Sequence, residues 1–373
     1  MIPDEVFQQT LLGFLSPVGR FLTDDSVSEV MINGHEEIYI ERGGRLELTD
    51  ARFPSDHALA SAVRNIAQFV GKSVDPDRPV LDARLPDGSR VCAILPPAAR
   101  RGICVSIRRF PKQRLTVDQL VRYGALTEPC RRFLELSVLV KRNVMVAGGT
   151  GSGKTSLLNA LSSFMPETDR IVVIEDSSEV QLQQPHAVYL EARPPDAKGR
   201  GAVTIRDLLR ATLRMRPDRI VVGECRGGEA LDLIQAMTSG HGGSISTVHA
   251  TYPHDTLHRL ETLCLMSDVE LPLAALRGQI ASAINMIVQT SRMNDGSRKI
   301  THVAECTGLN ENGGYALSML FEWRQTGVDP HTGKVLGQLT PTGEVPSFLD
   351  ELEGKGYELP PEMEGTAAIR GGG

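Results

Sequence analysis

Eight residues in the middle of the chain have the types and spacing of a phosphate-binding loop. The segment Gly148-Gly149-Thr150-Gly151-Ser152-Gly153-Lys154-Thr155 fits the pattern G-x-x-x-x-G-K-[ST]. Its glycines let backbone N–H groups converge on phosphate oxygens, Lys154 supplies a cation for the β- and γ-phosphates, and the Thr155 hydroxyl suits Mg²⁺. Ser156 lies in the following helix, whose positive dipole end would face the anion. The pattern predicts that ATP or GTP binds here.

The residues around the loop support this prediction. The apolar run Val144–Ala147 precedes it, and a helix striped by Leu157, Leu158 and Leu161 follows. The dinucleotide pattern G-x-G-x-x-G does not fit, because Lys154 stands where the third glycine is required. A glycine-rich turn that binds nothing would not need this strand and helix context.

Two later apolar runs end in acids. Ile171–Ile174 leads into Glu175, and Ile220–Val222 leads through Gly223 into Glu224. A single acid at a strand end is ordinary, but two such acids after a phosphate loop indicate catalysis, because Mg²⁺ and the attacking water need carboxylates. We interpret Glu224 as the main acid for Mg²⁺ and water, and Glu175 as the second.

Two histidines flank a glycine-led strand. His241 stands between glycines at its start, and His249 follows its last apolar residue. We expect both to contact or sense the nucleotide site, although a lone histidine is more often a satisfied core or surface residue. His254 and His258 have the spacing of a zinc motif, but Asp255 replaces the glutamate and no third ligand is evident, so we interpret them as a polar helix start.

A cationic helix comes between the two acids. The run Ile205–Asp218 predicts a helix that places Arg210 and Arg214 four residues apart on one face. Such a pair invites an anion. The partner is either a surface glutamate or the γ-phosphate of a neighbouring subunit's nucleotide.

The wider pattern predicts an α/β protein with several parts. From Asn143 to about residue 308, β-type runs alternate with helical ones, which is typical of a mainly parallel sheet covered on both faces. Residues 1–110 mix strand-like runs at Ser28–Ile32 and Glu37–Glu41 with one helical run, and predict a smaller α+β domain. Residues 111–142 would be a basic linker with a helical lead-in. Residues 309–373 would be a turn-rich accessory segment with a disordered tail from Gly365.

Charge is distributed unevenly along the 373 residues. The formal net charge is −6, but residues 100–142 hold eleven Lys and Arg against three acids, a local balance of +8. Such a run is commonly a solvated surface, or else it faces phosphates or an acidic neighbour. The net acidity and the low aromatic content, 5% with one Trp, argue against a nucleic-acid stacking surface.

Composition also bears on location. Six cysteines without a Cys-x-x-Cys pair, an acidic N-terminus and no long apolar run predict a reduced, cytoplasmic protein without a secretory signal or membrane span.

Four motifs in order resemble a known family. The loop at 148–155, Ile174-Glu175-Asp176, the stretch from Leu213 to Glu224 and the stretch 240–250 resemble the Walker A loop, aspartate box, atypical Walker B and histidine box of the type II/IV secretion ATPases. The segments 82–91 and 106–110 are similar to the N-terminal domain of the Tad/Flp pilus (CpaF-like) branch.

This resemblance implies a homohexameric cytoplasmic ATPase with a RecA-like domain. Nucleotide would bind between that domain and the N-terminal domain, with Arg210 and Arg214 completing the site and Arg108 or Arg109 reaching the phosphates. The ring would associate peripherally with the inner membrane and drive a platform protein in pilus assembly or secretion, with no direct nucleic-acid partner.

Two other functions compete with this one. RecA-like cores also serve nucleic-acid motors, which the basic window favours and the net acidity and few aromatics disfavour. A regulatory module with an inactive nucleotide site is the other alternative, and Lys154, Thr155, Glu175 and Glu224 argue against it.

Overall fold

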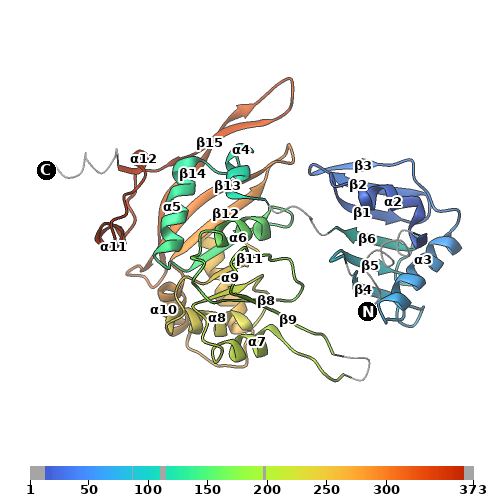
Figure 1. The fold of residues 1–373 in the computed structure, drawn as a ribbon, viewed down its shortest axis with the longest axis horizontal. Coiled ribbons are helices and arrows are strands. Elements are labelled where there is room, and N and C mark those ends of the chain that lie inside the picture. Colours follow the sequence, from blue (N-terminus) through green and yellow to red (C-terminus); the bar gives the residue numbers. More distant parts are fainter. Residues whose placement is uncertain (1–12, 86, 110–114, 196–198, 365–373) are drawn as a thin grey trace. The chain divides into compact units, whose positions relative to one another are not determined.

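A computed structural model describes residues 13–85, 87–109, 115–195 and 199–364 (Figure 1). The chain divides into two compact units, Met1–Gln113 and Arg114–Gly373, and each is described by itself. The tail from Gly365 that was predicted to be disordered lies outside the described residues.

The first unit is a six-stranded sheet with helices against one face. All its strand pairs are antiparallel, in the order β3-β2-β1-β6-β5-β4. Along the chain its elements are η1 (Ser16–Val18), α2 (Gly19–Thr23), β1 (Val27–Asn33), β2 (Glu37–Arg42), β3 (Arg45–Leu48), α3 (Asp56–Phe69), β4 (Val80–Arg84), β5 (Arg90–Ile94) and β6 (Cys104–Arg108).

Alternating side chains explain how this sheet forms. On β1, Val30 and Ile32 are fully buried beneath the helices, and Met31 between them points to the other face. The glycines at 43 and 44 have φ of +56° and +80°, which matches the tight turn between β2 and β3. The predicted α+β character of this region is confirmed.

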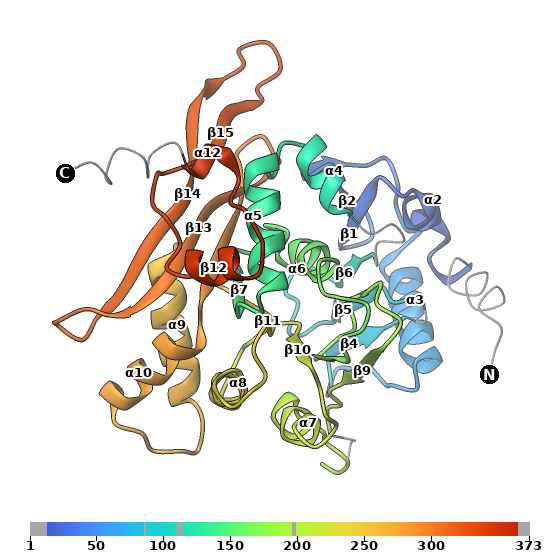
Figure 2. The ribbon, with the colours of Figure 1, turned by 60° about the vertical axis from the view of Figure 1, so that its left-hand side comes forward.

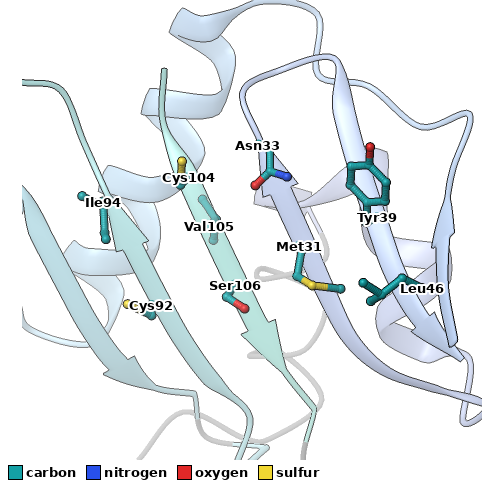
Figure 3. A pocket seen from close by; sticks show the side chains of 9 residues that line it. All are labelled: Met31, Asn33, Tyr39, Leu46, Cys92, Ile94, Cys104, Val105 and Ser106. Atoms are coloured by element: carbon teal, nitrogen blue, oxygen red, sulfur yellow. The ribbon is translucent and has the colours of Figure 1, made fainter. Parts of the chain in front are cut away.

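The other face of the sheet carries a shallow hollow of about 430 Å³ (Figure 3). The side chains around it come from five neighbouring strands, β3, β2, β1, β6 and β5: Met31, Asn33, Tyr39, Leu46, Cys92, Ile94, Cys104, Val105 and Ser106.

The second unit is built on a nine-stranded mixed sheet with the order β15-β14-β13-β12-β7-β11-β10-β8-β9. The six strands from β12 to β9 in that order are parallel, which confirms the predicted mainly parallel α/β fold. Its elements are α4 (Val117–Arg122), α5 (Glu128–Leu139), β7 (Val144–Gly148), α6 (Lys154–Ser162), β8 (Ile171–Glu175), β9 (Ala187–Glu191), α7 (Ile205–Thr212), β10 (Arg219–Val222), α8 (Glu229–Thr238), β11 (Ile245–Val248), α9 (Pro253–Leu265), α10 (Leu273–Ala283), β12 (Met286–Arg292), β13 (Arg298–Leu309), β14 (Tyr315–Val328), β15 (Val335–Pro341), α11 (Leu349–Gly354) and α12 (Pro361–Glu364).

Helices cover both faces of this sheet, so its central strands are buried throughout. On β7, Val144 and Val146 join the core under α4, α5 and α6, whereas Met145 and Ala147 join the core under α7 to α10 (Figure 2). A strand buried on both faces has a continuous apolar run, and this is why the sequence revealed it.

The strands after β12 extend the sheet in antiparallel pairing. The predicted boundary near residue 308 therefore falls inside the sheet, because β14 and β15 continue it. In Figure 1 the outer ends of β14 and β15 extend beyond the helices of the unit. Only the second half of β14 is polar and exposed, whereas its first half carries the buried Tyr315, Leu320 and Phe321. No described helix is both long and apolar enough to cross a bilayer.

A fully buried arginine joins three segments of the second unit. Arg219 opens β10, and its Nε donates to Asp169 Oδ2 at 2.6 Å. Its Nη1 donates to the carbonyl oxygens of Val138, at 2.8 Å, and Gly243, at 3.4 Å. The side chain thus links the start of β10 to α5, to the turn before β8 and to the glycine loop before β11.

Arg219→Ala should reduce the free energy of unfolding of this unit by about 3–5 kcal/mol, because it leaves Asp169 and two carbonyls without their partner. Chemical denaturation followed by circular dichroism measures the change. Arg132→Ala, at an exposed position on α5, serves as the control. A loss below about 1 kcal/mol would contradict this account of Arg219.

Candidate nucleotide site

The phosphate-binding loop connects the carboxyl end of β7 to the amino end of α6, and Ser156 lies in the first turn of that helix. Gly151 and Gly153 have φ of +68° and +95°, a region that glycine adopts without strain. Gly148 has no room for a side chain, because a Cβ there would lie 2.5 Å from the carbonyl oxygen of Thr290. A tight glycine-rich turn of this kind allows successive N–H groups to converge on a phosphate.

Two residues from the β12–β13 hairpin brace the loop, and sequence reasoning missed both. Thr290 Oγ1 donates to the carbonyl oxygen of Ser152 at 2.7 Å, and Arg298 Nε donates to that of Gly151 at 3.2 Å. They follow the loop by about 140 residues and reach it only because β12 pairs with β7. No local pattern in the sequence indicates this contact.

Lys154 and His249 lie together beneath the loop. The Lys154 side chain is buried, and its Nζ donates to the carbonyl oxygen of Gly149 at 3.1 Å and lies 3.4 Å from His249 Nε2. Burial and the Lys154 ammonium lower the pKa of His249 below its ordinary value, so the imidazole is neutral at pH 7. The structure thus brings the predicted His249 to the phosphate loop.

Glu224 also lies at this edge of the sheet, as its place after β10 predicted. Its Oε1 is 2.8 Å from His249 Nε2, and its Oε2 accepts a hydrogen bond from Arg226 at 2.7 Å. Arg226 also donates to Asp176 Oδ2 at 2.6 Å. One guanidinium cation therefore pairs with the negative charges of two carboxylates. Sequence reasoning missed Arg226, although its position two residues after Glu224 was a usable signal.

Glu175 holds the backbone that follows β8. Its carboxylate is buried against Gly223, and Oε1 accepts the N–H groups of Glu179 at 2.8 Å and Val180 at 2.9 Å. Burial raises the pKa of Glu175 to about 7. In this structure that oxygen serves the backbone of the next segment, whereas the sequence suggested a metal-binding role.

The carboxylate that meets Thr155 belongs to Glu179, a residue that was not among the predicted site residues. Glu179 Oε2 accepts a hydrogen bond from Thr155 Oγ1 at 3.3 Å. Glu179 lies four residues beyond the end of β8, in a segment without regular secondary structure. The available signal was the continuation of the aspartate box, Ser177-Ser178-Glu179.

These residues fit a nucleotide with Mg²⁺. The loop provides the N–H donors and Lys154 the cation, while the Thr155 hydroxyl and the carboxylates of Glu179 and Glu224 are the hard oxygen ligands that Mg²⁺ prefers. No set of three or more His, Cys, Asp or Glu in the described part of the chain could hold a metal by itself. Mg²⁺ commonly binds through one or two protein oxygens together with substrate phosphates.

His241 lies at the opposite end of the parallel strands from the phosphate loop, before the amino end of β11. It precedes β11, whereas His249 follows this strand, and β11 runs parallel to β7. Next to it, the N–H of Ser244 donates to Asn143 Oδ1, just before β7 begins. The structure therefore does not bring His241 to the phosphate loop of its own chain.

Helix α7 is shorter than predicted. It ends at Thr212 instead of continuing to Asp218, because Arg216 has a φ of +54° and precedes Pro217, a position that disfavours helix. Arg214 therefore lies beyond the helix, exposed, and does not share a helical face with Arg210.

Arg210 has an intramolecular partner. Its Nε donates to Asp232 Oδ1 on α8 at 2.8 Å, and Arg206 Nε donates to the other oxygen of the same carboxylate at 2.7 Å. The partner in the structure is therefore the buried Asp232 and not the surface glutamate that was one of the two expected partners.

Arg108 and Arg109, in the first unit, differ in exposure and in hydrogen bonding. Arg109 donates to the carbonyl oxygens of Asp24 and Val27, the latter at 2.9 Å, and to Asp25 Oδ1 at 3.2 Å, and only 9% of its side chain is exposed. Arg108, at the end of β6, is exposed. The Arg109 side chain thus forms hydrogen bonds with residues of its own unit.

The pKa of Glu175 predicts a pH dependence of stability. Because this pKa is raised from 4.5 to about 7 in the folded protein, folding retains a proton that the unfolded chain releases. Stability is therefore lost as the pH rises from about 4.5 to 7, by on the order of 3 kcal/mol. Glu175→Gln does not titrate, so its stability relative to the native protein should increase by roughly 2 kcal/mol between pH 5 and pH 8.

Denaturant melts of nucleotide-free protein at several pH values test this, with Glu167→Gln, at an exposed site, as the control. A difference between Glu175→Gln and the native protein that stays constant with pH would contradict the prediction.

Known proteins resemble this chain over most of its length. The sequence model of the family described as "Type II/IV secretion system protein" matches residues 14–317. The type IV secretion system protein PtlH of Bordetella pertussis is 37% identical over 314 residues, which cover 76% of this chain and 91% of PtlH. The type IV secretion system protein VirB11 of Brucella suis is 34% identical over 337 residues, which cover 82% of this chain and 92% of VirB11.

A solved structure shares the fold. The X-ray structure of the Legionella pneumophila ATPase DotB matches with a TM-score of 0.50 at 22% identity, over 79% of each chain. The family match, the two secretion relatives and the phosphate loop lead to one conclusion. The chain belongs to the type II/IV secretion system protein family and is one of its ATP-hydrolysing members.

Proposed function

We propose that this protein is the ATP-driven motor of a pilus-assembly or secretion machine, of the Tad/Flp type. It acts as a ring of six copies on the cytoplasmic side of the inner membrane, where it drives a membrane platform protein. The contact between Thr155 on the phosphate loop and Glu179 supports the hydrolytic part of this proposal, because a carboxylate lies next to the hydroxyl that is expected to hold Mg²⁺. Relatives described as type IV secretion proteins support the cellular part.

Different residues of the chain have different roles in the proposed reaction. The loop N–H groups and Lys154 bind the phosphates, and Lys154 stabilises the charge that develops on the transferred phosphoryl group. When bound, Mg²⁺ would neutralise phosphate charge, and the Thr155 hydroxyl would be one of the ligands of the metal. Glu179 orients the attacking water, while Glu224 is kept in place by Arg226 and His249.

Arginines outside the loop complete the proposed site. Arg108 is the candidate from the first unit, because its side chain is exposed whereas that of Arg109 is committed to Asp24, Val27 and Asp25. Arg210 and Arg214 remain candidates for contact with the nucleotide of a neighbouring subunit, and Arg210 must then leave Asp232.

The basic window does not favour the alternative of a nucleic-acid motor. Arg131 pairs with Glu128 at 2.7 Å and Glu135 at 3.2 Å, and Arg142 pairs with Glu351. Glu128 and Glu135 are already counted in the +8 balance, but Glu351 and Asp25, which pairs with Arg109 at 3.2 Å, lie outside the window and neutralise two of its positive charges within the chain. Single-stranded DNA should therefore leave ATP turnover unchanged at physiological salt, and a many-fold stimulation would support the alternative.

Two measurements test the cellular proposal. Mass photometry with Mg²⁺ and a non-hydrolysable ATP analogue should show a species of six chains. Cross-linking and affinity purification from the native membrane should recover a polytopic inner-membrane protein. A protein that remains monomeric and recovers no such partner would contradict the motor assignment.

Lys154→Ala should weaken ATP binding by at least about tenfold, because it deletes the cation that contacts the β- and γ-phosphates. Titration with a fluorescent ATP analogue measures the Kd. Lys141→Ala removes a lysine that precedes β7 at the other end of the strand and serves as the control. Unchanged affinity in Lys154→Ala would overturn the assignment of the loop.

Glu179→Gln should keep ATP affinity within about threefold and lower kcat by roughly 10²-fold or more, because the amide cannot accept a proton from water. Glu224→Gln should also lower kcat while preserving binding. Steady-state phosphate release and analogue titration separate the two effects, with Glu167→Gln as the matched control. A Glu179→Gln enzyme with native kcat would exclude Glu179 as the residue that orients water.

A further inference from the structure

The segment that carries Glu179 has no regular secondary structure, yet it is held from two sides. On the β8 side, Glu175 Oε1 accepts the N–H groups of residues 179 and 180, as described above. On the α6 side, Asn159 Oδ1 accepts the N–H of Gln181 at 2.9 Å, and Asn159 Nδ2 donates to the carbonyl oxygen of Glu179 at 3.4 Å. One amide side chain thus binds the backbone on both sides of residue 180.

The position of Asn159 on α6 connects this clamp to the phosphate loop. Asn159 follows Thr155 by four residues, so the two side chains share one face of the helix. Thr155 contacts the carboxylate of Glu179, and Asn159 contacts its backbone. Helix α6 therefore fixes both ends of the same glutamate relative to the loop from which the helix starts.

We propose that Asn159 is a positioning residue for ATP hydrolysis, which holds the segment 179–181 so that the Glu179 carboxylate stays at Thr155. The inference rests on the role proposed above for Glu179. Asn159 itself does not touch the reacting atoms. Its amide matches the backbone with one donor and one acceptor, an arrangement that an apolar side chain of the same size cannot reproduce.

The surroundings of Asn159 make it suitable for substitution. Its side chain is only partly buried, and it borders a cavity of about 320 Å³ that Ser163 and Gln181 also line. A somewhat longer side chain can therefore extend into this space without overpacking the core. Ser163 lies one turn after Asn159, directly after the last residue of α6, and its hydroxyl donates to the carbonyl oxygen of Ala160 in that helix at 2.6 Å.

The test compares three variants of the full chain. Asn159→Leu removes both hydrogen bonds and should lower kcat about 10- to 100-fold, because small displacements of a catalytic group are costly. The Kd for a fluorescent ATP analogue should stay within about twofold and the Tm within a few degrees. Asn159→Gln keeps both polar groups and should recover most of the kcat, whereas Ser163→Ala should match the native protein throughout.

Combination with Glu179→Gln separates this proposal from the proposed function. If Asn159 acts through Glu179, Asn159→Leu should add little to the loss in the Glu179→Gln background. Native kcat in Glu179→Gln would refute the role of Glu179 itself. Loss of kcat in Glu179→Gln but not in Asn159→Leu would overturn only the positioning role. Parallel losses of folding and ATP affinity in Asn159→Leu, with no recovery in Asn159→Gln, would make Asn159 a structural residue and overturn it as well.

Discussion

The close approach of β7 to β12 at Gly148 determines the rest of the site. A side chain at this position would collide with the carbonyl oxygen of Thr290, so only glycine lets the strand end against its neighbour and turn into the phosphate loop. The hydroxyl of Thr290 then fixes the loop through the carbonyl of Ser152. Because α6 starts from this loop, the contact also places Lys154, Thr155 and the residues one turn later.

The charges at this edge of the sheet are arranged for a polyanionic ligand that brings its own cation. Lys154 lies beneath the loop, and Arg226 compensates Asp176 and Glu224 at the neighbouring strand ends. Between these groups His249 is held neutral by burial and by the Lys154 ammonium. The carboxylate nearest to Thr155 comes from the irregular segment after β8, and its position depends on hydrogen bonds to backbone rather than on a strand.

The parts of the fold and site that the sequence predicts well are those with a local cause. The phosphate loop, the buried parallel strands and the acid at 224 each follow from a contiguous pattern. Residues such as Thr290 and Arg298 could not be predicted, because strand pairing alone brings them to a loop far away in the sequence. Periodicity misplaced Arg214, since the backbone before Pro217 stops the helix. The strand β14 was also missed, although its first half is largely apolar and includes the buried Leu320 and Phe321.

At the carboxyl ends of the parallel strands we propose a Mg²⁺–ATP site, with the metal at Thr155 and with Glu179 facing the γ-phosphate. An X-ray structure of the protein with Mn²⁺ and a non-hydrolysable ATP analogue tests it most directly, because the anomalous signal locates the metal. The metal should lie within bonding distance of Thr155 Oγ1, and the β- and γ-phosphates should bind the loop N–H groups. The Glu179 carboxylate should lie on the side of the γ-phosphate where water attacks. A metal bound away from Thr155, or a Glu179 side chain turned away from the γ-phosphate, would contradict it.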